Sequence, residues 1–143
     1  MTADADIRSL LETRSLALHD KNPDTLLALY VPGALMYELA PPLAYRVDPV
    51  HAREGYVAWF ATWTGPIVYE TRDFDIAMHG DFALATGFVR IAGAKTDGTT
   101  NSSWFRQTLA LTRTAQGWRI AHQHTSVPFY MDGSFRAAVD LLP

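Results

Sequence analysis

Glu38 is the carboxylate in this sequence that is best placed for acid–base chemistry. It stands in an apolar stretch, between Tyr37 and Leu39. An apolar pocket raises the pKa of a carboxyl group, and a general base works best when its pKa lies near the working pH. Glu38 is therefore a candidate catalytic base. The alternative is a structural glutamate at a strand edge, either in water or paired with Arg14.

Two histidines, His122 and His124, are separated by one residue near the end of the sequence. Side chains two positions apart in a strand point to the same face, so we expect both imidazoles on one face. The same spacing assigns that face to Trp118, Ile120 and Ser126. Imidazoles on a half-buried face can hold a substrate oxygen or transfer a proton, which makes both histidines candidate catalytic residues.

The histidine pair also has two other interpretations. A His-x-His pair on a strand can provide two metal ligands, with Glu38 or His51 as the third. Two ligands alone are weak evidence, so we predict no metal site. The pair can instead be structural, with neutral rings hydrogen-bonded in the core or in a subunit interface.

Arg106 and Trp104 are candidates for substrate binding on the preceding strand. They are two residues apart and share a predicted face with Thr108, whereas Phe105 and Leu109 fall on the other face. An arginine beside an aromatic ring suits a carboxylate or enolate oxygen. The alternative for Arg106 is an ion pair across the sheet, and the sequence leaves open which face is concave.

An aromatic stripe at helical spacing runs through Tyr56, Trp59, Phe60 and Trp63. We expect Tyr56, Trp59 and Trp63 to line the substrate pocket. The alternative is that these rings belong to the hydrophobic core.

The elements that position these residues follow from hydrophobic periodicity and turn signals. The apolar spacing predicts three helices, over residues 4–20, 24–30 and 51–63. A strand is predicted over residues 34–39. After Pro66, four alternating segments separated by short turns predict an antiparallel meander, with strands over 67–79, 82–94, 102–114 and 118–127. The tail that follows is expected to contain a short helix over 134–141. Helices segregated from an antiparallel sheet make an α+β fold.

The strand ALMYE at residues 34–38 and the closing segment GWRIAHQHTS at residues 117–126 resemble SnoaL-like and ketosteroid-isomerase-like proteins of the nuclear-transport-factor-2-like superfamily. The resemblance covers essentially the whole chain. It implies one domain over residues 1–143, with residues 130–143 as a C-terminal tail. It also implies a cystatin-like cone, in which about three N-terminal helices and a curved antiparallel sheet enclose an apolar pocket.

The resemblance to ketosteroid isomerase places the catalytic base of that enzyme at Glu38. Its oxyanion hole consists of a tyrosine and a protonated aspartic acid. These two positions fall near Arg14 and Leu109 in this sequence, so both donors are missing. The resemblance therefore does not imply the same steroid chemistry.

Composition limits the classes of partner. The chain has 143 residues, of which 19% are charged, a net charge of −3 and no cysteine. These values exclude disulfides and zinc–thiolate sites, and they disfavour nucleic-acid binding. No apolar run is long enough to cross a membrane. No dinucleotide or phosphate-binding glycine motif is present, so no cofactor is expected. A cytoplasmic location is the default.

Apolar residues occupy both faces of the predicted strands, as at Phe82, Ala83, Leu84 and Ala85. Helices cover only one face of a sheet. The other face would expose an apolar patch larger than monomers usually tolerate. We therefore expect a homodimer through the sheet.

The predicted function is a pocket that binds a small apolar, oxygenated molecule. Convergence of Glu38, His122 and His124 on that pocket, with Arg106 beside them, would suit isomerase, cyclase or dehydratase chemistry. The sequence leaves open whether the protein is an enzyme. The alternative is a non-catalytic ligand-binding or oligomerisation module, as in the association domain of calcium/calmodulin-dependent kinase, which the closing segment also resembles.

Overall fold

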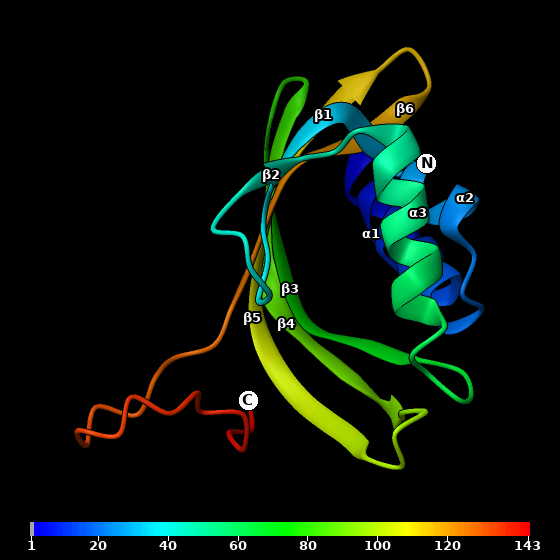
Figure 1. Ribbon diagram of the computed structural model, residues 1–143. Coiled ribbons are helices and arrows are strands. Elements are labelled where there is room, and N and C mark those ends of the chain that lie inside the picture. The colour runs from blue at the N-terminus through cyan, green and yellow to red at the C-terminus, as the bar shows by residue number, and fades with distance from the viewer. Residues whose placement is uncertain (1) are drawn as a thin grey trace.

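The computed structural model describes residues 2–143, in which three helices lie on the concave side of a curved sheet (Figure 1). The helices are α1 (Ala3–His19), α2 (Pro23–Leu27) and α3 (Pro49–Phe60). The side chains of Thr2, Asn22 and Asp48 accept hydrogen bonds from backbone N–H groups of the first turns. These groups have no partner within the helix, so each cap stabilises a helix start by about 1 kcal/mol.

The described strands form one six-stranded sheet in the order β2–β1–β6–β5–β4–β3. Their bounds are Tyr30–Tyr37 (β1), Tyr45–Arg46 (β2), Val68–His79 (β3), Phe82–Ala94 (β4), Thr100–Thr114 (β5) and Gly117–Ser126 (β6). Strands β3 to β6 pair antiparallel in sequence order, which confirms the predicted meander. The predicted α+β architecture is also confirmed.

The sheet is mixed rather than wholly antiparallel, because β1 lies parallel to β6. The backbone N–H of Ile120 donates to the carbonyl of Leu29 at 2.8 Å, just before β1 begins. The chain therefore enters β1 beside the start of β6, and the two strands run in the same direction. This pairing brings the end of β1, which leads into Glu38, next to the end of β6.

Three predicted helices differ from the structure. The third ends at Phe60 rather than at residue 63. The second ends at Leu27 rather than at residue 30, because Tyr30 already belongs to β1 and its side chain is buried. The predicted helix over 134–141 is wrong. The tail turns at Asp132, whose carboxylate accepts a hydrogen bond from the Ser134 N–H, and then folds back on itself, with the N–H of Ala138 donating to the carbonyl of Pro128.

The core fills the space between α1 and the concave face of the sheet. Apolar side chains of α1 join inward-facing side chains of β5 and β6 in one buried cluster, and α1 also contacts β3; the buried residues include Ile7, Leu11, Leu18, Leu109, Leu111 and Ile120. Each such side chain contributes about 1.5–3 kcal/mol relative to an exposed one. This contact holds α1 across the concave face, as predicted. None of the helices within residues 2–143 has the length and apolar character that a membrane crossing requires.

Candidate functional site

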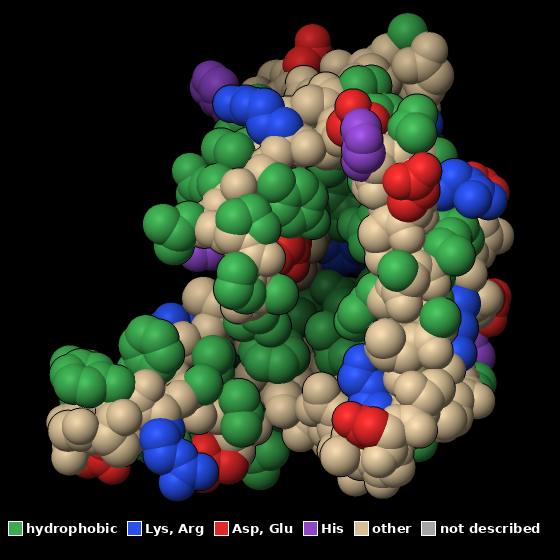
Figure 2. Space-filling model, viewed as in Figure 1, with side chains coloured by type: hydrophobic (Ala, Val, Ile, Leu, Met, Phe, Trp, Pro, Cys, Tyr) green, Lys and Arg blue, Asp and Glu red, His purple; other side chains and the backbone are tan. Residues whose placement is uncertain are grey.

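A cavity of about 570 Å³ lies between the concave face of the sheet and helices α1 and α3. Figure 2 shows it as a hollow lined mostly by hydrophobic side chains, with acidic and basic atoms at its floor. Its size falls in the range of small-molecule sites. The apolar part of its wall includes Leu18, Leu26, Ile91 and Trp59.

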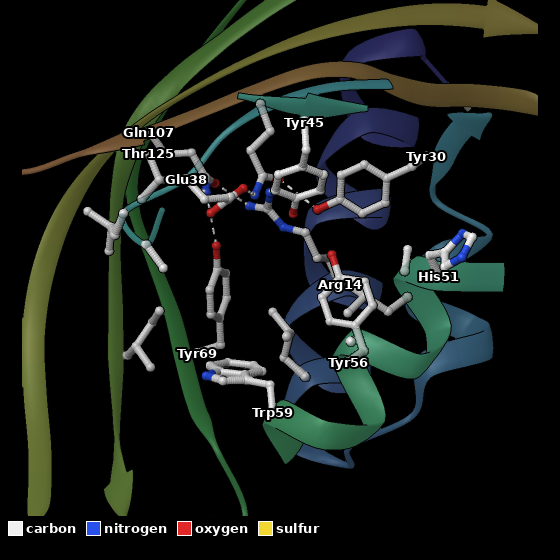
Figure 3. Close-up of a pocket in the computed structure, with 18 of the residues that line it drawn as sticks. Arg14, Tyr30, Glu38, Tyr45, His51, Tyr56, Trp59, Tyr69, Gln107 and Thr125 are labelled. Atoms are coloured by element: carbon white, nitrogen blue, oxygen red, sulfur yellow. Dashed lines mark hydrogen bonds between the residues drawn. The ribbon is translucent and has the colours of Figure 1, made fainter. Parts of the chain in front are cut away.

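Arg14 of α1 provides the positive charge at the floor of this cavity (Figure 3). The residue is only 1% exposed. Its Nη1 donates to Gln123 Oε1 at 3.1 Å and its Nη2 to Gln107 Oε1 at 2.7 Å, while its Nε has no hydrogen-bond partner within residues 2–143. Within the same residues no carboxylate lies within 4.0 Å of the guanidinium. Arg14 is therefore a buried cation that is solvated by amides instead of by an anion.

Glu38 follows β1 and provides the negative charge. Gln123 Nε2 donates to Glu38 Oε1 at 2.8 Å. Burial raises the pKa of Glu38, and the hydrogen bond from Gln123 and the charge of Arg14 partly oppose this rise. A raised pKa makes a carboxylate a stronger base, which suits a group that exchanges a proton with a ligand.

Hydroxyl groups surround this pair of charges. Tyr30 donates to Gln123 Oε1 at 2.6 Å, and Gln107 Nε2 donates to the hydroxyls of Tyr69 at 3.1 Å and Thr125 at 3.0 Å. Burial raises the pKa of Tyr30 and of Tyr69, so both phenols remain protonated at neutral pH.

Two further tyrosines, Tyr45 of β2 and Tyr56 of α3, line the cavity, and Figure 3 shows both rings beside Arg14. Burial raises the pKa of Tyr45 to about 12 and that of Tyr56 well above its ordinary value. Both phenols are therefore neutral hydrogen-bond donors. Tyr56 and Trp59, both predicted as pocket-lining residues, do line the cavity.

The two histidines do not reach this cavity. A β-bulge interrupts the pairing of β5 with β6, where Leu111 lies opposite Ile120 but Ala110 lies opposite His122. The extra residue, Ala121, reverses the alternation of side chains along β6. Residues after the bulge that face inward are therefore Gln123 and Thr125, which are buried. The prediction that His122 and His124 share the face of Trp118 and Ile120 is wrong for this reason.

On the outer face of the sheet the histidines meet Tyr37. The ring centroid of Tyr37 lies 4.9 Å from that of His122 and 5.3 Å from that of His124, edge-on in both cases. The Nδ1 atom of His122 lies 2.7 Å from the carbonyl oxygen of Leu35. Within residues 2–143 no group of three or more His, Cys, Asp or Glu side chains is arranged to hold a metal ion.

Arg106 and Trp104 lie on the same outer face, because the inward-facing positions of β5 are Gln107, Leu109 and Leu111. Arg106 Nε donates to Ser126 Oγ at 3.2 Å, and the guanidinium of Arg72 lies 4.4 Å from the ring centroid of Trp104. The predicted convergence of Arg106 and His122 with Glu38 on one cavity is therefore corrected. His124 shares with Glu38 only a second hollow, which the C-terminal tail also lines.

Trp63 is the one predicted aromatic residue of the pocket that instead belongs to the core. It follows the end of α3, is 4% exposed and does not line the cavity. A Cβ atom at Gly93, which has a φ of 153°, would lie 3.0 Å from the indole, so glycine is needed for this contact. Lys95 Nζ lies 4.0 Å from the centroid of the Trp63 ring.

The SnoaL-like domain matches residues 7–130. This chain belongs to the SnoaL-like domain family. The fold is that of an NTF2-like protein of unknown function from Pseudomonas putida, with 26% identity, coverage of 100% of this chain and 99% of the other, and a TM-score of 0.84. The predicted nuclear-transport-factor-2-like cone is thereby confirmed.

Two further solved structures share the fold of this SnoaL-like domain at lower identity. A ketosteroid isomerase-like protein from Erwinia carotovora atroseptica is 18% identical, with coverage of 85% and 93% and a TM-score of 0.70. A candidate dehydratase of the NTF2-like family from Streptomyces avermitilis is 17% identical, with coverage of 87% and 97% and a TM-score of 0.72. No curated protein matches the sequence significantly.

Most of the polar residues at the floor of the cavity in this SnoaL-like domain were not predicted from the sequence. Gln107 lies two residues before Leu109 and four before Leu111 in β5, so its side chain points to the same face as theirs. A glutamine on the face of a strand that packs into the core indicates a buried polar cluster. Gln123 gives no such signal, because the bulge at Ala121 changes its face. Arg14 lies on the apolar face of α1, which predicts burial but not the partners it meets.

Proposed function

We propose that this SnoaL-like domain binds a small, largely apolar, oxygenated molecule in the cavity and that Glu38 transfers a proton to or from it. One observation carries the proposal. The carboxyl group of Glu38 is desolvated at the wall of an apolar cavity and is held through only one oxygen, Oε1, by Gln123. Within residues 2–143 no hydrogen bond holds the second oxygen, which remains available to a ligand.

Charge that develops on the ligand oxygen has donors close by. Tyr45 and Tyr56 line the cavity as neutral phenols, and neither hydroxyl donates to another group within residues 2–143. Donors aimed at a developing oxyanion in a dry site stabilise it strongly. Removal of a proton next to a carbonyl group, or loss of water from a hydroxylated ring, would use this arrangement. The ketosteroid isomerase-like and candidate dehydratase relatives support these reaction classes only by analogy of fold.

The experiment follows proton exchange. The protein is incubated in D₂O with bicyclic ketones, with and without a carboxylate group, and exchange of the protons next to the carbonyl is measured by NMR. We expect the unmodified protein to catalyse exchange above background and the Glu38→Gln variant to show none above background. Glu70→Gln is the matched control, because Glu70 pairs with Arg90 on the outer face. Exchange that persists in Glu38→Gln would exclude Glu38 as the proton carrier.

A second candidate function is ligand binding without chemistry. Its support is that the polar groups of the floor are largely paired with one another, through Gln123 and Gln107. In that case bicyclic ligands bind, and no proton exchange exceeds background for any of the ketones.

We also propose that the chain forms a homodimer through the outer face of the sheet. Phe82 is 51% exposed and Leu84 41% exposed on that face. The C-terminal tail, residues 128–143, lies on the side of the sheet opposite to the helices (Figure 1). It carries Met131 at 84% and Phe135 at 63% exposure. A second copy would cover both surfaces.

A further inference from the structure

We propose that the cavity takes its ligand as an anion, a flat apolar molecule with one carboxylate, and that the carboxylate is directed toward Arg14. The inference rests on the proposed ligand-binding function and names the class of ligand. It is carried by a charge in the cavity that no neighbouring group neutralises directly.

A buried guanidinium without an adjacent anion is an unusual arrangement. Removing a charge from water is costly, and buried charges in proteins are normally paired. Arg14 is 1% exposed, yet its two Nη atoms contact amide oxygens and its Nε contacts no acceptor within residues 2–143. The nearest anion in its network, Glu38, is reached only through Gln123. An anionic group of the ligand would supply the missing counter-charge.

The rest of the cavity suits a flat ring system. Trp59, Tyr56 and Tyr45 line it, together with Leu26 and Ile91. A volume of about 570 Å³ holds a molecule of two or three fused rings with room to spare. Such a ligand fills the apolar part of the cavity while its acid group reaches the polar floor, where attraction to the guanidinium is weakly screened.

A bound carboxylate changes the protonation of Glu38. Two carboxylates in one dry cavity repel each other, so Glu38 takes up a proton when the anion binds. Glu38 then begins as a proton donor to the ligand. Besides Arg14, the titratable groups that face this part of the cavity are phenols, those of Tyr30, Tyr45, Tyr69 and, from α3, Tyr56. These phenols stay neutral.

The mouth of the cavity carries three more titratable groups, Arg46, Asp48 and His51. His51 Nδ1 lies 3.5 Å from Asp48 Oδ1, and both side chains are largely exposed to solvent. Solvent screens these charges, so the pH dependence of anion binding is set mainly by Glu38.

Matched acid and amide probes test the proposal. Binding of 2-naphthoate and 2-naphthamide, and of biphenyl-4-carboxylate and its amide, is measured by titration calorimetry at pH 6 and pH 8. The acids are expected to bind at least tenfold more tightly than their amides at pH 6. Once the pH exceeds the pKa of Glu38 in the free protein, their affinity falls by about tenfold per unit, because binding requires a proton. Repeating the titration in buffers of different ionisation enthalpy counts that proton.

Three variants assign the effect to the two residues. Arg14→Met removes the charge and is expected to abolish the preference for acids, whereas Arg14→Lys retains it in part. Glu38→Gln needs no proton and is expected to bind 2-naphthoate equally at pH 6 and pH 8, which tests the proposal even if Arg14→Met fails to fold. Arg106→Met on the outer face is the charge-matched control and should bind as the unmodified protein does.

Each outcome decides between the two proposals. Equal affinity for acids and amides overturns the anion proposal and leaves the ligand-binding function intact. A preference for acids that survives in Arg14→Met also overturns it, as does an unchanged pH dependence in Glu38→Gln. Failure of both acids and both amides to bind counts against the ligand-binding function as well.

Discussion

Arg14 and Glu38 carry opposite charges in one cavity but are joined only through Gln123. The amide oxygen of Gln123 accepts from Arg14 Nη1 at 3.1 Å, and its Nε2 donates to Glu38 Oε1 at 2.8 Å. One amide thus orients both charged groups. Because they do not close into a direct ion pair, each keeps part of its capacity to bind a ligand.

Replacing Gln123 tests how much this bridge stabilises the fold. Gln123→Leu keeps the volume but removes the partner of Arg14, Glu38 and Tyr30 at once, and buried groups without partners cost about 1–3 kcal/mol each to leave unsatisfied. We expect the free energy of unfolding, measured by urea denaturation, to fall by about 2–4 kcal/mol. Gln116→Leu, in the exposed turn before β6, should change it by less than about 0.5 kcal/mol. Equal effects of the two substitutions would contradict the bridge.

Glu38 should make the stability of the protein depend on pH. Its pKa is raised in the folded state, chiefly by burial, so the unfolded chain releases the proton at lower pH than the folded chain does. The contribution of Glu38 is therefore most favourable below the unfolded pKa and is lost as the pH rises through the folded pKa. The Glu38→Gln variant has no carboxyl group at this position, so it does not lose stability in this way as the pH rises.

The measurement is the difference in the free energy of unfolding between Glu38→Gln and the unmodified protein, at pH 4, 5.5 and 7. This difference should shift in favour of the variant as the pH rises. A shift in the opposite direction would mean that Arg14 and Gln123 together lower the pKa of Glu38 more than burial raises it.

The sequence predicts the layers of this fold better than the faces of its strands. Turns such as Gly80-Asp81 and the two-residue alternation locate the meander, and the aromatic spacing locates α3. The direction of β1 depends on which end of β6 it meets, which no local pattern encodes. Glu38 lines the cavity, and it was placed there through the resemblance to ketosteroid isomerase rather than through any local pattern.

The bulge at Ala121 explains the main error in the site. Nothing in the residues 117–126 marks an extra residue, since bulges form where twist and packing of neighbouring strands require them. Continuous alternation through that point moves the histidines to the cavity and the glutamine to the outer face. The structure has the reverse arrangement.

Adjacent residues in β6 offer a direct test of this arrangement. Thr125 is 6% exposed and its hydroxyl accepts from Gln107 Nε2, whereas His124 is exposed on the outer face. We expect Thr125→Val to lower the free energy of unfolding by about 1 kcal/mol and to weaken binding in the cavity. His124→Ala should leave cavity binding unchanged. If His124→Ala weakened the binding of 2-naphthoate and Thr125→Val did not, the assignment of faces would be reversed.

Association of two copies is tested by the mass in solution and by one matched pair of variants. The chain mass is 15.9 kDa, and light scattering at micromolar concentration is expected to give twice that value. Phe82→Glu places a charge on the outer face of the sheet, where burial against a second copy would make the charge costly. It should shift the mass toward that of one chain. Leu16→Glu is the control, because Leu16 is 62% exposed on α1, on the other side of the sheet, and should leave the mass at twice the chain value.

Deleting residues 128–143 should weaken association as well, because the exposed Met131 and Phe135 would no longer be available to the second copy. A mass of one chain for the unmodified protein, or equal effects of Phe82→Glu and Leu16→Glu, would show that the outer face is not the surface on which two copies meet.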